Sequence, residues 1–209
     1  MECSRNTGCG YPGFGVGGGC MLYIIAIALG VLVGLLKKGS MSNLLSIKIE
    51  KAWLILASFL IQFLAQVLSV NGFEFTVRYS LAIQGVAFAL LLTGLCFNRK
   101  YAGMLVIGGG CILNVLVMML NGGKMPVSRD VLVNAGLNQA LELFATGGDG
   151  RHILADQSTK LLILGDIMSP PGILSIMMKI VSIGDIIVVI GLFLLVFEAT
   201  AGRPLRRKR

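Results

Sequence analysis

The chain has 209 residues, of which 56% are apolar and 13% charged, with a formal net charge of +8 and a mean hydropathy of +0.86. Soluble domains average about 45–50% apolar and about 25% charged residues, so this chain has too little polar surface to coat a soluble globule. The composition also excludes a disordered chain, a collagen-like fibre and a small toxin stapled by disulfides. The sequence therefore predicts an integral membrane protein.

Five apolar segments approach the length of about 17–25 residues that a helix needs to cross a bilayer. They are Met21–Leu36, Ala52–Val70, Ser80–Phe97, Ala102–Leu120 and a stretch within 173–198. Hydropathy does not alternate along any of them, which argues against a β-barrel, and irregular backbone cannot face lipid. We therefore expect an all-α polytopic bundle of about five transmembrane helices with a partly helical outer loop.

The expected organisation is a Gly- and Cys-rich extension (1–20), four transmembrane helices (21–120), an extracytoplasmic loop (121–172), a fifth transmembrane helix (173–198) and a basic tail (199–209). The extension lacks the basic region followed by an apolar run that defines a secretory signal peptide. Because Met21 starts the first apolar segment directly, our leading hypothesis is that the natural start is Met21. A short external tail is the alternative.

Lysine and arginine are divided unequally between the two ends of this bundle. One end receives eleven of them, namely Lys37, Lys38, Lys48, Lys51, Arg99, Lys100, Arg203, Arg206, Arg207, Lys208 and Arg209. The other end receives six, namely Arg5, Arg78, Lys124, Arg129, Arg151 and Lys160. Because basic residues favour the cytoplasmic side, we expect the N-terminus outside and the C-terminus in the cytoplasm.

The sequence indicates the class of some partners but does not identify a cofactor. The basic tail suits anionic lipid heads, whereas nucleic acid is not expected, because the tail has no aromatic residue to stack on bases. No metal site is predicted, since the cysteines lack the CxxC pairs of a zinc site. The sequence also contains no GxxxxGK[ST] loop, no HExxH and no GxSxG elbow, so an enzyme is not favoured and no cofactor can be named.

The outer loop carries an amphipathic pattern. Ser128 suits a helix N-terminus, and one apolar face follows it, made by Val133, Leu137, Ala140, Leu141 and Phe144. The polar face lacks basic residues, so we expect this helix to cover the bundle rather than to seek anionic membranes. Farther on, residues 161–178 suit either a re-entrant or a surface segment.

Two ionisable residues of this loop suggest a metal-binding or catalytic pair. His152 and Asp156 are four residues apart, and on a helix they would share a face. Such a pair could bind a metal or act as a general base, while a solvated histidine in a turn is the alternative.

Asp185 is the most informative residue, because an ionised aspartate in mid-bilayer costs roughly 2.5–3.5 kcal/mol. If its helix begins near Val181 instead, Asp185 lies one turn from the outer surface and joins the loop residues. Polar stripes offer partners for it: Ser58, Gln62, Gln66 and Ser69 in the second span, Gln84 in the third, and Gly110, Asn114 and Asn121 in the fourth. These stripes are either packing contacts or the walls of an outward-open polar cavity between spans two, four and five.

Three short motifs occur in order: NGGKMPVS at 121–128, LGD at 164–166 and SIGDI at 182–186, the last leading to Ile190-Gly191. With these motifs the chain resembles a family of small bacterial multi-pass membrane proteins known only as a domain of unknown function. The resemblance covers Met21 to Phe197 and implies a protein of the bacterial inner membrane. It supplies no catalytic residues.

Three functions remain open. In the first, an outward-facing pocket binds a small polar ligand, an ion or a lipid head in a transport or accessory role; its lining would be Asp185, Asp166, His152, Asn121, Lys124 and Asn114. In the second, an intramembrane enzyme acts on a lipid-linked or peptide substrate, with Asp166 and Asp185 as paired acids or His152 as base with Asp156. In the third, the protein is a structural subunit, and Asp185 pairs with a basic residue of a membrane-protein partner.

Overall fold

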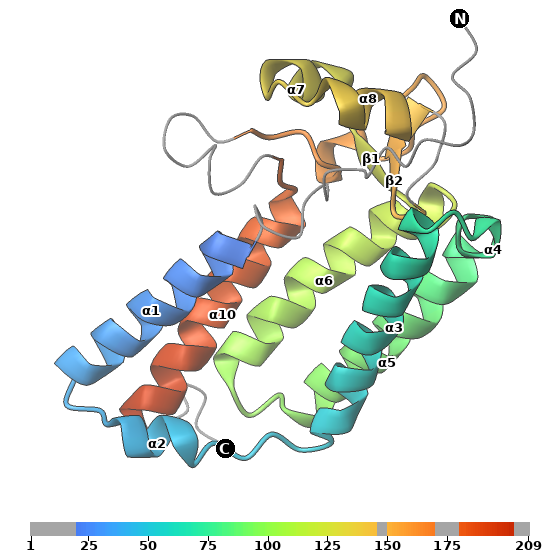
Figure 1. Ribbon diagram of the computed structural model, residues 1–209. Helices are drawn as coiled ribbons and strands as arrows, with labels where there is room; N and C mark the ends of the chain where they lie inside the picture. Colours follow the sequence, from blue (N-terminus) through green and yellow to red (C-terminus); the bar gives the residue numbers. More distant parts are fainter. Residues whose placement is uncertain (1–19, 146–149, 170–179, 203–209) are drawn as a thin grey trace, which may run out of the picture.

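The computed structural model describes residues 20–145, 150–169 and 180–202. The predicted extension 1–20, apart from the backbone of its last residue, lies outside this part of the chain. So do residues 170–178 of the expected re-entrant segment and the basic residues of the tail from Arg203 onward. Figure 1 shows a bundle of long helices with a small layer of short helices and strands over one end. The predicted helical bundle is confirmed.

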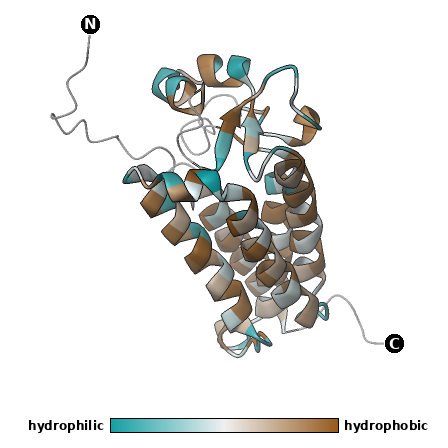
Figure 2. Ribbon diagram, turned by 90° about the vertical axis from the view of Figure 1, so that its right-hand side faces the viewer, coloured by the Kyte–Doolittle hydropathy of each residue, from teal (hydrophilic) through white to brown (hydrophobic). Residues whose placement is uncertain are grey.

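The bundle is built from five long helices: α1 (Cys20–Leu36), α3 (Ala52–Val70), α5 (Ser80–Phe97), α6 (Ala102–Leu120) and α10 (Ile183–Ala201). The last four are long and apolar enough to cross a membrane, and α1 is a shorter apolar helix. At 1.5 Å per residue, 18 or 19 residues extend about 27–29 Å, close to the thickness of a bilayer's hydrocarbon core. Figure 2 shows apolar residues along these helices and more polar ones at their two ends.

The helices pack in the spatial order α1, α10, α6, α5, α3. Glycines allow the closest approach, between α6 and α10. A Cβ added at Gly191 would lie 2.6 Å from the backbone nitrogen of Ile107, and one added at Gly110 would lie 2.8 Å from a methyl carbon of Val188. Small residues let helix backbones meet in this way without side chains between them.

This order overturns the expected cavity between spans two, four and five. The second span, α3, packs along α5, whereas the fourth and fifth spans, α6 and α10, pack along each other. The polar stripe of α3 therefore faces α5, where Ser58 is fully buried. The polar face of each helix could be predicted from the sequence, but the neighbouring helix that this face contacts could not.

The end of the bundle that carries the basic loops is held by buried polar contacts. The Glu198 side chain, 1% exposed, accepts hydrogen bonds from the first two backbone amides of α6, at 3.0 Å from Ala102 N and 2.9 Å from Gly103 N. Negative charge at a helix N-terminus is favourable, and these amides have no partner within their own helix. Helix α2 (Met41–Leu45) lies at the same end, beside α10.

We call the layer at the opposite end the α/β layer. It contains β1 (Met125–Val127), α7 (Arg129–Asn134), α8 (Asn138–Ala145), β2 (His152–Leu154) and the 3-10 turn η1 (Leu162–Leu164). The two strands are parallel, with Met125 beside His152 and Val127 beside Leu154. Their inner side packs on a small core made by Val127, Leu132, Ala140 and Phe144.

The structure corrects the single amphipathic helix expected after Ser128. The chain forms two short helices, separated at Gly136, which has a left-handed φ of +68°. The break resets the phase of the apolar face, so that Leu132 is fully buried while Val133 is 52% exposed. The two helices do cover one end of the bundle, as predicted.

The last long helix also differs from its expected bounds of 173–198. Val181 is extended and forms an antiparallel bridge with Met168, and α10 begins only at Ile183. The helix continues to Ala201 and ends at Gly202, whose φ is +67°. Residues 173–179 of the expected helix lie outside the described part of the chain. Val181 fitted a helix by its apolar character, but composition does not distinguish a buried extended residue from a helical one.

Candidate functional site

The six residues predicted to line one pocket fall into separate groups of contacts. Asn114 and Asp185 meet between α6 and α10, and His152 and Asp166 meet within the α/β layer. Asn121, just after α6, joins that helix to the loop: its Nδ2 donates to the Lys160 carbonyl at 2.9 Å, and its Oδ1 accepts from Lys160 N at 3.0 Å. Lys124 is half-buried immediately before β1.

Asp185 lies in the first turn of α10, not in the middle of the helix. Its Oδ2 accepts from the Ser182 backbone amide at 3.2 Å, and its own amide donates to the Ser182 hydroxyl at 3.0 Å. These two bonds form a capping box. Asn114 completes the cluster, since its Nδ2 donates to Asp185 Oδ1 at 2.8 Å and its Oδ1 accepts from the Ser182 hydroxyl at 3.0 Å. This arrangement explains Asp185 as a residue that starts a helix.

His152 faces a different carboxylate from the one the sequence suggested. It lies in β2, so the helix that would have aligned it with Asp156 does not exist. Its Nε2 is 3.9 Å from Asp166 Oδ2, and its ring packs on Phe144 with centroids 5.0 Å apart. Asp166 is 8% exposed, because its backbone bridges to Val127 at the edge of the small sheet.

Asp156 instead organises a turn at the surface. Its Oδ1 accepts from the Ser158 amide at 2.8 Å and from the Ser158 hydroxyl at 2.7 Å. These hydrogen bonds hold the pKa of Asp156 below its ordinary value. The described hydrogen bonds of Asp156 therefore lie within its own turn, whereas the carboxylate nearest to His152 Nε2 among the described ion pairs belongs to Asp166.

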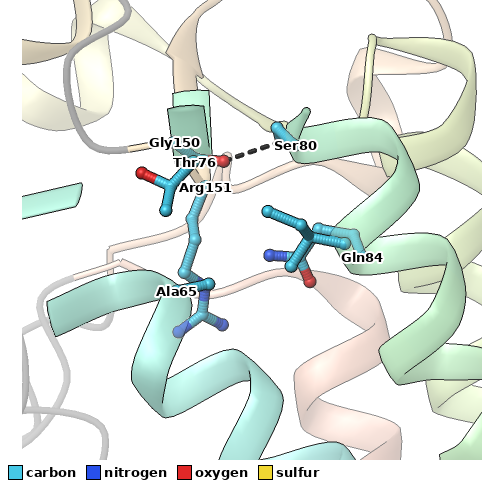
Figure 3. A pocket seen from close by; sticks show the side chains of 7 residues that line it. Ala65, Thr76, Ser80, Gln84, Gly150 and Arg151 are labelled. Atoms are coloured by element: carbon cyan, nitrogen blue, oxygen red, sulfur yellow. Dashed lines mark hydrogen bonds between the residues drawn. The ribbon is translucent and has the colours of Figure 1, made fainter. Parts of the chain in front are cut away.

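A polar pocket lies elsewhere, where α3, α5 and the α/β layer meet. Its described lining is Ala65 of α3, Thr76 of α4 (Glu74–Arg78), Ser80, Ile83 and Gln84 of α5, and Gly150 and Arg151. It encloses about 190 Å³ of empty space, counting its open side, and its interior has room for a single water-sized group. Figure 3 shows the Arg151 side chain extending between the helices, with its guanidinium and the Gln84 carboxamide facing the same space.

The backbone that carries Arg151 is fixed on both sides. The Ser80 hydroxyl donates to the Gly150 carbonyl at 2.7 Å, and the Met125 amide of β1 donates to the Arg151 carbonyl at 2.6 Å. Gly150 has a φ of +69°, and a Cβ there would lie 3.1 Å from Ser69 Oγ, so glycine suits this close passage along α3. The side chain of Arg151 is therefore aimed into the bundle by the surrounding fold.

Gln84 is the unusual member of the lining. Its side chain is 1% exposed, and its carboxamide oxygen has no hydrogen-bond partner among the described residues. The carboxamide oxygen of Gln66, in α3, is also buried without a hydrogen-bond partner among the described residues. A buried polar group left without a partner costs about 1–3 kcal/mol, so a water or ligand group that donates a hydrogen bond to this acceptor would be favourable here.

Sequence reasoning noted Gln84 and Gln66 only as members of polar stripes and did not select Arg151, Ser80 or Thr76. Ser80 and Gln84 are four residues apart at the start of a span and therefore share a face, which was a readable signal. Arg151 gave none, because it comes from a loop far along the chain. Within the described residues, no three His, Cys, Asp or Glu side chains come together to hold a metal ion.

The fold and the pocket together define a class of protein. It is a bundle of helices of membrane-spanning length, covered at one end by a small α/β layer, with Arg151 extending between α3 and α5 (Figure 3). The model of a family of unknown function, DUF5317, matches residues 46–197, and the chain belongs to this family. The resemblance drawn from the three short motifs is thereby confirmed.

Comparison with individual proteins adds one relative. An uncharacterized protein of Thermotoga maritima is 26% identical to the chain over 174 residues, which cover 83% of this chain and 86% of that protein. No solved structure matches the chain.

Proposed function

We propose that the protein is a binding protein of the bacterial cytoplasmic membrane, and that its outward-facing pocket between α3, α5 and the α/β layer receives a small polar group. The observation that carries this proposal is Gln84, a fully buried amide whose oxygen has no partner in the described structure and which borders an open-sided space. Burying such a group in a helix interface has a cost in stability that a bound group would offset.

The proposed orientation has the N-terminus outside and the C-terminus in the cytoplasm. It is supported by the positions of the basic loops, because Lys37, Lys38, Lys48, Lys51, Arg99 and Lys100 all lie at the end away from the α/β layer. Basic residues favour the cytoplasmic side, so the α/β layer and the pocket would face outward. The cluster of Asn114, Ser182 and Asp185 would then start α10 at the outer surface.

Cysteine accessibility tests the pocket directly. In a full-length chain whose five native cysteines are replaced by alanine, Ala65→Cys places a thiol in the pocket, and Leu64→Cys places one on the neighbouring lipid-facing position, where leucine is 48% exposed. The probe is the silver ion, which is close to water in size and therefore suits so narrow a space. Reaction is read as loss of later maleimide labelling in denatured protein.

We expect silver added outside intact cells to protect the thiol at position 65 and to leave that at position 64 labelled. Protection at neither position would show that water does not reach the pocket and would end the proposal. Protection only in inverted vesicles would show that the pocket opens to the cytoplasm, and the orientation would be wrong.

A second candidate, an enzyme acting at the membrane surface, is favoured by one contact, the approach of His152 Nε2 to Asp166 Oδ2. An imidazole oriented by a carboxylate can serve as a general base. The version with Asp166 and Asp185 as paired acids has no support, because Asp185 is engaged with Ser182 and Asn114. Turnover of a lipid-linked or peptide substrate that His152→Gln abolishes would establish the enzyme.

A further inference from the structure

We propose that the group received by this pocket is a neutral hydroxyl group that donates a hydrogen bond to the carboxamide oxygen of Gln84, and that this hydroxyl belongs to the headgroup of an outer-leaflet lipid. This inference rests on the proposed function and adds to it the chemical class and the source of the ligand. A free polyol carries the same chemical group, so the experiment tests both sources.

The unsatisfied atom of the pocket is an acceptor. Gln84 is 1% exposed, and its carboxamide oxygen accepts no hydrogen bond from the described residues. The Thr76 hydroxyl donates to the Phe73 carbonyl at 2.8 Å. The Ser80 hydroxyl donates to the Gly150 carbonyl at 2.7 Å. These two hydroxyl protons are therefore already used, and the group that suits the Gln84 oxygen is a ligand that brings a donor of its own.

The same lining selects a neutral donor. An anionic oxygen offers only lone pairs, which would face the lone pairs of the Gln84 oxygen and repel them. A cation would be buried without a carboxylate beside it, since none of the described lining residues is acidic, and an unpaired buried charge costs far more than a buried neutral group. Arg151 has a further interaction in the structure, so its charge does not decide which ligand binds.

The size of the pocket selects a hydroxyl among neutral donors. The interior has room for a single water-sized group. A hydroxyl is one oxygen with one hydrogen, so it fits this space while the carbon that carries it stays at the open side. An amide N–H belongs to a larger planar group, and an aliphatic amine is protonated at neutral pH and therefore charged.

The depth of the pocket points to a lipid as the source. Helix α4, which contributes Thr76 to the lining, also carries exposed aromatic side chains: Phe75 is 63% exposed, Tyr79 is 46% exposed, and their ring centroids lie 4.7 Å apart. Phe73, immediately before α4, is 56% exposed. Exposed aromatic side chains beside a span are typical of the headgroup level of a bilayer, so the pocket would open where the hydroxyls of lipid headgroups lie.

Binding is measured by thermal unfolding of the full-length protein, delipidated in lauryldimethylamine oxide. This detergent has no hydroxyl group, whereas the sugar headgroup of a maltoside detergent would compete for the site. The probes are dioctanoylphosphatidylglycerol, whose headgroup is a glycerol; dioctanoylphosphatidylmethanol, which has the same acyl chains and charge but no hydroxyl; and glycerol at the same concentration.

Two variants remove the acceptor, Gln84→Leu and Gln84→Met, and the second keeps nearly the length of glutamine. The matched control is Gln62→Leu. It removes an amide of α3 whose nitrogen donates to Ser58 Oγ at 3.4 Å and which is not among the described lining residues.

We expect phosphatidylglycerol to raise the unfolding temperature of the wild type, and the other two probes to have no effect. The apparent affinity for phosphatidylglycerol should fall at least about fivefold, which is about 1 kcal/mol, in both Gln84 variants and should stay within about twofold in Gln62→Leu. Without lipid, Gln84→Leu should unfold no earlier than the wild type, because it removes a buried amide whose oxygen has no partner among the described residues.

The other results overturn the inference in distinct ways. Equal stabilisation by phosphatidylmethanol would show that the hydroxyl is not recognised. Equal stabilisation by glycerol, lost in both Gln84 variants, would overturn the lipid source and leave a site for free polyols. Stabilisation by no probe would leave water as the occupant, and equal loss of affinity in Gln62→Leu and Gln84→Leu would place binding outside the pocket; either result would overturn the hydroxyl site. Silver protection at position 65 is independent of all these probes, so an accessible pocket without hydroxyl binding would refute this inference and leave the proposed function standing.

Discussion

Replacing Asp185 separates two roles for this residue, starting α10 or binding a ligand. Asp185→Ala removes the acceptor for the Ser182 amide and the acceptor for the Asn114 amide. Loss of a helix cap costs about 1 kcal/mol, and a buried donor left without its partner costs about 1–3 kcal/mol. We therefore expect the free energy of unfolding to fall by about 2–4 kcal/mol. Asp185→Asn keeps one acceptor oxygen and should lose about half as much.

Reversible unfolding of the purified protein in mixed micelles, with increasing dodecyl sulfate, measures this change. A double-mutant cycle of Asp185→Ala with Asn114→Ala isolates the contact between them, and residues that share a direct hydrogen bond typically couple by about 0.5–3 kcal/mol. Silver protection of a thiol at position 65, in the pocket between α3 and α5, should be unchanged in Asp185→Asn. An Asp185→Ala protein as stable as the wild type, within about 0.5 kcal/mol, would refute the capping argument. Loss of ligand binding in that stable variant would make Asp185 a binding residue after all.

Three further predictions concern the helix contacts and one turn. Glu198→Ala should lower the free energy of unfolding by about 2–4 kcal/mol, because two backbone amides at the start of α6 lose their acceptor, and Glu198→Gln should lower it less. Gly191→Ala should cost about 1–3 kcal/mol in the same unfolding assay, since its Cβ would lie 2.6 Å from a backbone nitrogen of α6. Gly109→Ala, whose Cβ would meet nothing within 4 Å, should be neutral or stabilising. The pKa of Asp156 is lowered in the folded protein, so the stability that its turn contributes is present above the unfolded pKa and is lost as the pH falls through the folded pKa. Amide exchange of residues 156–159, corrected for intrinsic rates, should show this loss on acidification in the wild type and no such dependence in Asp156→Asn.

The sequence predicted three helices residue for residue: Ala52–Val70, Ser80–Phe97 and Ala102–Leu120. Each is an uncharged apolar run, and charged or polar residues next to it, such as Lys51 and Arg99, mark where the run stops. The start of α10 could not be read in this way. Residues on both sides of Ile183 are apolar, and the local signal that begins the helix is the pair Ser182 and Asp185, which the long apolar run obscured.

The candidate site was predictable only in part, because its members come from different parts of the chain. The Gln84 and Gln66 amides could be recognised as polar groups in apolar helices. That α3 packs on α5, and that Gly150 carries Arg151 back to this interface, depends on contacts between distant segments. The prediction that Asp185 and His152 share one site rested on their common position at the outer end, and being at the same end does not bring side chains into contact.

Buried polar groups in this bundle differ in one respect that separates structural from functional roles. Ser182 and Glu198 are each at most 1% exposed, and their polar atoms accept hydrogen bonds that start α10 and α6. Asn98, fully buried, likewise donates to two backbone carbonyls. Gln84 is equally buried, yet its carboxamide oxygen has no partner in the described structure. An amide that only joined helices would be satisfied by them, as Asn98 is. The cost of burying the Gln84 amide is therefore the reason to look for function between α3 and α5. Gln84→Leu should leave the fold intact and abolish binding of the proposed polar group.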